Sequence, residues 1–306
     1  MKFKPTIAVP ILLAAVFLLT AVFSFLPASA IGTDENPYLS TVIIQLVIFT
    51  IPSLIYCSLR GGSEFSSNLR VRIPKPSTIL LMVCALVLMI CGGGVIDYFM
   101  STVNPVSMAE SSTAEYASFA MEADVFNGVY LVLAFAVLPA VTEEFLFRGI
   151  VLYEYSTMNV ATSVVFSAAM FAMCHFSPVR FPSLFFCGLV LAGVTYATRS
   201  VIAPMIVHTA YNVAVLFFEE YIFHIARKNN ISGILLVIIM AFLALVALAL
   251  AAFEASSMYR IYSEENYPSD YVPKKKVKLF KSFTETVFSP TFLALVVMYI
   301  ILVLII

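Results

Sequence analysis

The chain is short of charged residues. Asp, Glu, Lys and Arg make up 11% of its 306 residues, whereas hydrophobic residues make up 61%. An ordinary soluble domain is about a quarter charged, and a soluble fold of this length could hardly hide so much apolar surface. The low charge therefore excludes an ordinary soluble domain. We expect an integral membrane protein that has the lipid bilayer as a partner and binds no nucleic acid.

Several types of site are missing as well. The five cysteines are odd in number and have no metal-site spacing, so we expect no disulfide framework. None of the three histidines is followed by Glu, which excludes the HExxH motif of zinc site-two proteases, and no GxGD aspartyl motif occurs. Gly61, Gly62 and Ser63 match the letters of a rhomboid-like GxS but lie in a basic loop, where we interpret them as a turn.

What the sequence does contain is a series of long apolar runs. Nine runs of about 17 to 28 residues are each long enough to cross a bilayer as a helix. They lie at residues 7–25, 39–59, 78–99, 128–155, 158–176, 181–197, 201–223, 234–253 and 287–306. The first run also resembles a secretory signal peptide, but its length favours an uncleaved anchor. We predict an all-α, polytopic transmembrane helical bundle of about nine spans, or eight if the first is a cleaved signal.

Lys and Arg are distributed unevenly between the two sides of these spans. With the N-terminus inside, thirteen fall on the inner side, three on the outer side, and Arg148 within a span. The inner ones are Lys2, Lys4, Arg60, Arg70, Arg72, Lys75, Arg199, Arg260, Lys274, Lys275, Lys276, Lys278 and Lys281, and the outer ones are Arg180, Arg227 and Lys228. This positive-inside bias predicts a cytoplasmic N-terminus. We expect the membrane to be a bacterial plasma membrane.

No internal repeat and no separate soluble module are detectable in the sequence, so we predict a single polytopic membrane domain over residues 1–306. Residues 255–286 form a basic inner linker. Its KKKVKLFK stretch is interpreted as a cluster of positive charge that determines topology.

Three of the predicted spans carry the ionisable side chains from which we infer a site. Glu143 and Glu144 sit in AVLPAVTEEFLFRGIVLY, a second span carries His175, and a third carries His208 with Asn212. An ionisable residue at the centre of a membrane helix costs about 2.5 to 3.5 kcal/mol on insertion scales, so such residues usually have a function. If the fourth span is one continuous helix, these groups lie about 12 to 25 Å from the inner ends of their helices. We therefore expect an intramembrane site.

Helical spacing assigns different surroundings to the two glutamates. Glu144 and Arg148 are four residues apart on one helix face, where an ion pair offsets the desolvation of both. Glu143 is rotated by about 100° and is left free to face a neighbouring helix. A desolvated carboxylate in that position suits general-base work on water.

Two further pairs have the same spacing. His208 and Asn212 are four residues apart and can point from one helix toward one place, while Phe171 precedes His175 by four residues and can brace its ring. With a carboxylate from the fourth span, these side chains supply a base, a proton carrier and donors for a developing oxyanion. Those are the parts that hydrolysis needs.

Three motifs carry a resemblance to a known family. They are EExxxR at Glu143, Glu144 and Arg148, FxxxH at Phe171 and His175, and HxxxN at His208 and Asn212. In this order and on separate spans, they resemble the motifs of the CAAX prenyl protease type II and bacteriocin-processing family (CPBP, also called ABI). The resemblance covers residues 128–215, which we take as the motif-bearing catalytic core.

The resemblance implies an all-helical intramembrane endopeptidase, of a family once regarded as metalloproteases and later as glutamate proteases. In its terms Glu143 activates the water with the help of His175, while His208 and Asn212 stabilise the oxyanion. The supporting residues would be Glu144, Arg148 and Phe171. We expect no cofactor, although Glu143, His175 and His208 are ligand types that zinc accepts.

Two other functions stay open. A non-proteolytic membrane scaffold or bacteriocin immunity protein could use the same fold, because fold alone does not fix function. A transporter could use the buried charges as a proton relay, although the missing repeat argues against it. As a protease, the chain would act on a peptide or a membrane-anchored protein. The resemblance implies prenylated CAAX proteins in eukaryotes, and a peptide pheromone, bacteriocin precursor or membrane-anchored regulator for a bacterial relative.

The predicted topology can be tested by cysteine labelling in intact cells. The changes are Val277→Cys and Ser112→Cys, made singly in a chain whose five native cysteines are replaced. Position 112 lies in a predicted outer loop and should react with an impermeant thiol reagent, whereas position 277 should be protected. Strong labelling at 277 without labelling at 112 would overturn the orientation.

Overall fold

The structure, a computed structural model, describes residues 3–26, 37–62, 65, 69–105, 125–228, 232–264 and 277–306. Every regular element in these ranges is a helix, which confirms the all-α prediction. By length and composition, six helices can cross a membrane, or seven if one bent pair counts as a single span. The chain is therefore a polytopic helical bundle.

The elements follow the apolar runs of the sequence closely. In chain order they are α1 (Pro5–Phe25), α3 (Pro37–Gln45), η1 (Leu46–Thr50), α4 (Ile51–Arg60), η2 (Pro76–Thr78), α6 (Ile79–Val103), α9 (Val125–Val132), η3 (Leu133–Val137), α10 (Leu138–Glu144), η4 (Phe145–Val151), α11 (Leu152–Ser156), α12 (Val160–Met173), α13 (Phe181–Thr198), α14 (Ile202–Lys228), α15 (Gly233–Glu264), α16 (Leu279–Val287) and α17 (Pro290–Ile305). Each of the nine predicted runs is helical over most of its length.

Three of the nine runs differ from simple long spans. The run at 158–176 contains only the 14-residue helix α12, because the chain turns at Cys174 and His175 ahead of Pro178. In α14, the apolar helix among the described residues is Ile202–Phe217. The last run is α17, joined to α16 at an angle of 55°. The number of complete membrane crossings remains a prediction.

The fourth span is continuous from Gly128 to Ser156. It runs through α9, η3, α10, η4 and α11, so it continues past Arg148, as the sequence argument requires. Both η3 and η4 are π-helical, and η3 ends just before Pro139, which occupies the first turn of α10. A wider π turn accommodates the missing N–H of proline without breaking the helix. In the second span, the π-helical η1 likewise ends just before a proline, Pro52, in the first turn of α4.

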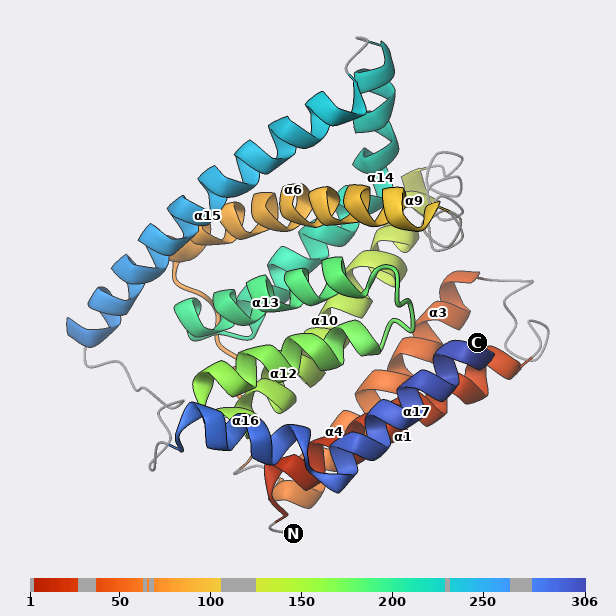
Figure 1. Cartoon of the computed structure of the whole chain (residues 1–306), viewed down its shortest axis with the longest axis vertical. Helices are drawn as coiled ribbons and strands as arrows, with labels where there is room; N and C mark the ends of the chain where they lie inside the picture. The colour runs from red at the N-terminus through yellow and green to blue at the C-terminus, as the bar shows by residue number, and fades with distance from the viewer. Residues whose placement is uncertain are drawn as a thin grey trace.

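The helices pack side by side around the fourth span (Figure 1). On one side α1 lies along α17 and near α4, and on the other α12, α13 and α6 follow one another, with α15 as the outermost helix along α6. The main core lies where α1 meets the fourth span, and it includes Phe17, Leu146, Phe147 and Ile150. The motif-bearing helices thus lie inside the bundle.

Helix α1 is an integral part of this core. Its residues Val9, Leu13, Val16 and Phe17 are fully buried, and the hydroxyl of Thr291 donates to the carbonyl of Thr6 at 2.6 Å. Such packing is what an uncleaved first span requires.

Several sequence predictions fall in the connections. Gly61 and Gly62 form a turn with φ of 136° and 59°, as expected, while Ser63 lies outside the described residues. Both ends of the linker at 255–286 are helical, because α15 reaches Glu264 and α16 begins at Leu279. Lys274, Lys275 and Lys276, and the acidic part of the outer segment at 106–124, also lie outside the described residues.

Gly188 allows α12 and α13 to approach closely. A Cβ on this glycine would lie 2.9 Å from the Cα and 3.0 Å from the Cβ of Ala168, whereas a Cβ on Gly193 of the same helix would meet nothing within 4 Å. Small residues have this role between membrane helices, where close backbone approach supplies the packing energy.

These two glycines give a matched test of the packing. Gly188→Ala should destabilise the protein by about 1 to 3 kcal/mol, because the new methyl group forces α12 and α13 apart. Gly193→Ala should leave stability unchanged or raise it slightly. Thermal unfolding of the purified variants in one detergent measures both. Equal melting temperatures for the two variants would contradict the close approach.

Candidate functional site

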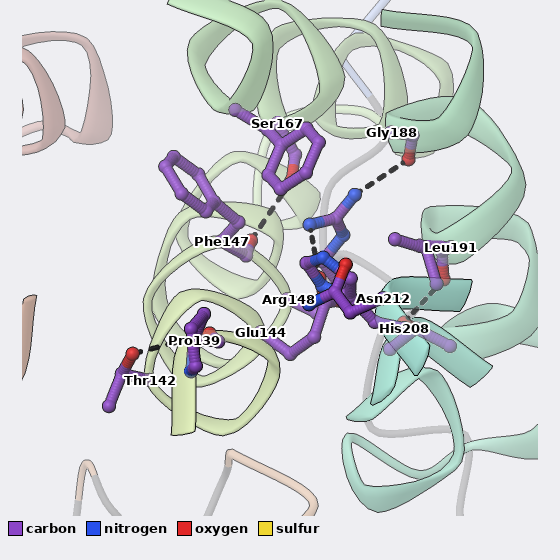
Figure 2. Close-up of polar contacts among 12 residues, drawn as sticks. Pro139, Thr142, Glu144, Phe147, Arg148, Ser167, Gly188, Leu191, His208 and Asn212 are labelled. Atoms are coloured by element: carbon purple, nitrogen blue, oxygen red, sulfur yellow. Dashed lines mark hydrogen bonds and ion pairs between the residues drawn. The ribbon is translucent and has the colours of Figure 1, made fainter. Parts of the chain in front are cut away.

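Arg148 is the largest fully buried side chain of the described residues and lies at the centre of the site. Its Nη1 donates to Oε1 of Glu144 at 2.8 Å, and its Nη2 donates to the carbonyl of Gly188 at 3.0 Å. Figure 2 shows the guanidinium between these two acceptors. The ion pair predicted from the four-residue spacing is therefore present, and it is completely buried.

Phe171 of α12 forms the wall behind this ion pair. The Cζ atom of Arg148 lies 4.7 Å from the centroid of its ring, a cation–π distance. The ring also contacts His208 edge to face, with centroids 5.7 Å apart, and His175 at 4.9 Å. The predicted contact of Phe171 with the His175 ring is thus present, and the same phenyl ring also contacts Arg148 and His208.

His208 of α14 is attached to the ion pair. Its Nδ1 lies 2.9 Å from Oε1 of Glu144, the same oxygen that accepts from Arg148. A carboxylate held by an arginine is ionised and can only accept, so Nδ1 carries the hydrogen of this bond. Nε2 is then the ring nitrogen that points to other partners.

Asn212, one turn beyond His208 on α14, attaches this helix to the fourth span. Its Nδ2 donates to the carbonyl of Ala136 at 3.3 Å, within the π segment η3. In the same way, the hydroxyl of Ser167 donates to the carbonyl of Phe147 in η4 at 2.9 Å (Figure 2). The π segments therefore offer backbone carbonyls to neighbouring helices, a local irregularity that is common at functional sites.

Glu143 differs from Glu144 in its surroundings, as predicted. Its side chain is 7% exposed, and its Oε2 is buried without a hydrogen-bond partner. Glu143 is in no ion pair among the described residues, although the charge of Arg148 interacts with both glutamates. Oε2 of Glu144 and Nε of Arg148 are also buried without a partner. Such polar atoms are costly unless a water or a ligand satisfies them.

His175 lies elsewhere than the sequence predicted. It was expected within a spanning helix, but α12 ends at Met173, and His175 is an exposed residue of the following turn. Its Nδ1 lies 3.0 Å from the carbonyl of Phe171, which can only accept, so Nδ1 is the donor. Nε2 consequently keeps its lone pair and is directed away from that bond. The physical reason for the early end is the turn that precedes Pro178.

The structure links most of the predicted site residues. Direct contacts join Glu144, Arg148, His208 and Phe171, and the ring of Phe171 connects His175 to this group. Among the described residues, no group of three or more His, Cys, Asp or Glu side chains is placed to hold a metal ion. Whether Glu143, His175 and His208 hold zinc stays a prediction.

The sequence analysis did not predict the polar contacts of three groups, which are the carbonyl of Gly188 and the carboxylates of Glu154 and Asp97. The carbonyl of Gly188 cannot be foreseen from residue type. Glu154 lies in the apolar pattern LYEY, yet it is buried and accepts from Nε and Nη2 of Arg60 at 2.6 and 2.5 Å and from the hydroxyl of Tyr56 at 2.9 Å. Asp97 forms a longer ion pair with Arg180, at 3.8 Å. A charged residue inside a predicted span was the available signal for Glu154 and Asp97.

The central ion pair can be tested through stability. Arg148→Ala leaves Glu144 buried without its cation, which should cost about 3 to 5 kcal/mol and reduce the folded yield. Arg148→Lys should be less severe, because it keeps the charge but loses the planar contact with Phe171. The exposed pair Lys281 and Glu285 has the same spacing, so Lys281→Ala serves as the control and should change little. Normal yield for Arg148→Ala would show that the pair is dispensable.

Comparison with known protein families locates a match in the region just described. The family model described as type II CAAX prenyl endopeptidase Rce1-like matches residues 125–214. This segment contains all three motifs and every residue of the buried network around Arg148. No curated protein and no solved structure matches the chain. Residues 125–214 are therefore similar to the type II CAAX prenyl endopeptidases, in agreement with the resemblance of the three motifs.

Proposed function

We propose that the protein is an intramembrane endopeptidase that hydrolyses a peptide bond of a membrane-anchored substrate with a water activated by Glu143. The observation that carries this proposal is the buried, unpartnered Oε2 of Glu143 beside the network of Glu144, Arg148 and His208. A free carboxylate next to fixed donors is the arrangement that general-base hydrolysis needs. The family match supports the same type of activity.

The two glutamates are suited to different tasks. Oε1 of Glu144 already accepts hydrogen bonds from Arg148 and His208, so this oxygen is occupied by protein donors. Glu143 has no comparable partner, so it is the better base. We assign the proton of the attacking water to Glu143 and a structural role to Glu144.

His175 assists from the end of α12. Because Nδ1 donates to the carbonyl of Phe171, the lone pair of Nε2 is available to accept a proton or to orient the water. The side chain is exposed, in contrast to the buried glutamates. We propose that His175 lies where water enters the site.

His208 and Asn212 are proposed to stabilise the oxyanion. One N–H of the Asn212 amide is used by Ala136, and the second remains for the substrate. Nδ1–H of His208 is used by Glu144, so Nε2 becomes a donor only when the ring is protonated. The hydrogen bond between Nδ1 of His208 and Glu144 links the supporting ion pair to the reaction.

The chemical step then balances with protein groups and water alone. The water oxygen forms a bond to the carbonyl carbon while its proton passes to Glu143, and the carbonyl oxygen becomes an oxyanion facing Asn212 and His208. The C–N bond then breaks, and Glu143 returns the proton to the leaving amine. The products are a new carboxylic acid, which releases its remaining proton to water, and a new amine.

Purified protein and a defined peptide test the activity itself. The substrate is a synthetic prenylated peptide that ends in a CAAX sequence, with the same peptide lacking the lipid as its control, and mass spectrometry detects the products. We expect cleavage that depends on the protein and is faster for the prenylated peptide. Absence of cleavage of both peptides, with full complementation of a deletion strain by Glu143→Gln, would instead support a scaffold.

Glu143→Gln should separate catalysis from folding. The change keeps the shape of the side chain and removes the base, so turnover should fall by about 10²-fold or more at normal folded yield. Glu144→Gln should instead lower the folded yield, because it leaves Arg148 buried without its counter-ion. Turnover and melting temperature are measured on the same samples. Normal turnover for Glu143→Gln would show that the base lies elsewhere.

The same assay tests the role of Asn212 and whether the activity requires a metal ion. Asn212→Ala should reduce kcat by about 10² to 10³ with little change in KM, the effect of losing one oxyanion donor. Asn212→Asp keeps the shape of the side chain and should lower kcat by as much.

Activity should survive a chelator, because the proposed step uses no metal ion. Loss of activity on chelation and its return with zinc would favour metal chemistry instead.

A further inference from the structure

A second concave site lies between α13 and α15, apart from the buried network. It is a cavity of about 260 Å³ lined by Gly193, Tyr196, Ala197, Arg199, Ala255 and Tyr259. Arg199 follows α13 directly, at the end that the positive-inside bias places in the cytoplasm. Along α13, Arg199 lies eleven residues beyond Gly188, which is about 16 Å. The cavity is therefore separate from the proposed catalytic groups.

The backbone holds Arg199 in an unusual conformation. Its φ is 52°, in the left-handed region that few residues other than glycine, asparagine and aspartate adopt. The next residues are fixed to the basic segment before α6, because the hydroxyl of Ser200 donates to the carbonyl of Arg72 and the N–H of Val201 donates to that of Arg70 at 3.1 Å. This arrangement fixes the guanidinium-bearing residue at the rim of the cavity.

Basic residues also occur in the chain segment that is bonded to the residues after Arg199. Arg70 and Arg72 belong to the segment that is hydrogen-bonded to residues 200 and 201, and the charge of Arg70 interacts with Tyr196. Glu254 precedes the lining residue Ala255 but interacts with Cys84 of α6, on another face of α15. Arg199 is thus the cationic side chain that lines the cavity, at the end of α13 that is predicted to face the cytoplasm.

The rest of the cavity is apolar and borders the lipid. Its floor is made of small residues, and Tyr259 beside it is 71% exposed. Only 6% of the apolar stretch of α15 is buried, so most of the side chains of this stretch are at least partly exposed although the helix lies along α6. Figure 1 shows α15 as the outermost helix of the bundle. An apolar slot with arginine at its rim matches an amphipathic molecule better than a free anion.

We propose that this cavity binds an anionic phospholipid, with the phosphate of the headgroup at Arg199 and the acyl chains along α15. Basic pockets between membrane helices on the cytoplasmic side bind such headgroups. The tyrosines Tyr196 and Tyr259 provide the amphipathic rings that are favoured at this depth. The site is independent of the proposed peptide hydrolysis.

The test is a lipid titration of the purified full chain in detergent, followed by native mass spectrometry. The probes are phosphatidylglycerol, phosphatidylcholine and inorganic phosphate, added separately. We expect phosphatidylglycerol to bind at least about fivefold more tightly than phosphatidylcholine, the contribution of roughly one basic contact at a membrane surface. Because the titration measures binding alone, failure of the proteolytic proposal would not affect it.

Three variants assign the binding to the cavity. Arg199→Asn tolerates the left-handed backbone but removes the charge, so the preference for phosphatidylglycerol should disappear. Gly193→Leu places a side chain in the open space of the cavity and should weaken lipid binding without removing charge. Arg260→Asn is the control. Arg260 is exposed on α15, next to Tyr259, but does not line the cavity, so this variant should keep the preference for phosphatidylglycerol.

Melting temperatures confirm that each variant is folded before it is titrated. Equal loss of preference in Arg199→Asn and Arg260→Asn would overturn the proposal, because the effect would then be general surface charge. Binding of inorganic phosphate that depends on Arg199, without any preference between the two lipids, would also overturn it and indicate a soluble anion instead. Unchanged binding in Gly193→Leu would show that the cavity is not the site.

Discussion

The buried guanidinium of Arg148 is the group on which the rest of the site depends. It pairs with Glu144 on its own helix, donates to a carbonyl of α13 and lies against a ring of α12. Through the shared oxygen of Glu144 it also reaches His208 of α14. A buried charge is stable only when its partners are fixed, so these contacts hold four segments of the bundle in one arrangement.

This constraint explains how two adjacent carboxylates can differ. The helix directs Glu144 toward Arg148 and rotates Glu143 away from it, so Oε1 of Glu144 is held by two donors while Glu143 is in no ion pair among the described residues. The π segments on either side of the pair contribute as well. Their carbonyls accept side chains from α12 and α14, which fixes the neighbouring helices against the fourth span. The glutamates therefore lie on a rigid support.

Periodicity and apolar length were enough to predict the helices and the contacts within one helix. The pair of Glu144 and Arg148, the edge-on contact of Phe171 with His175 and the continuous fourth span all follow from spacing along one chain segment. Contacts between different helices could not be predicted from this spacing. The acceptors of Arg148 and Asn212 on other segments are backbone carbonyls of Gly188 and Ala136, which no residue pattern encodes.

The position of His175 shows a second limit of the sequence. Hydropathy continued the apolar run through Phe176, but hydropathy does not register where a helix must end ahead of a proline. The imidazole consequently lies in an exposed turn instead of inside a span. The buried pair of Glu154 and Arg60 was missed for a related reason, because a single charge in an apolar run has little effect on an average.

The most direct test of the central role of Arg148 is a double-mutant cycle with Glu144. Thermal unfolding is measured for Glu144→Gln, Arg148→Met and the double variant, each in the same detergent. If the two side chains stabilise each other as a buried pair, the double variant should be more stable than Arg148→Met alone, with a coupling free energy of about 1 to 3 kcal/mol. Additive effects of the two substitutions would contradict that role.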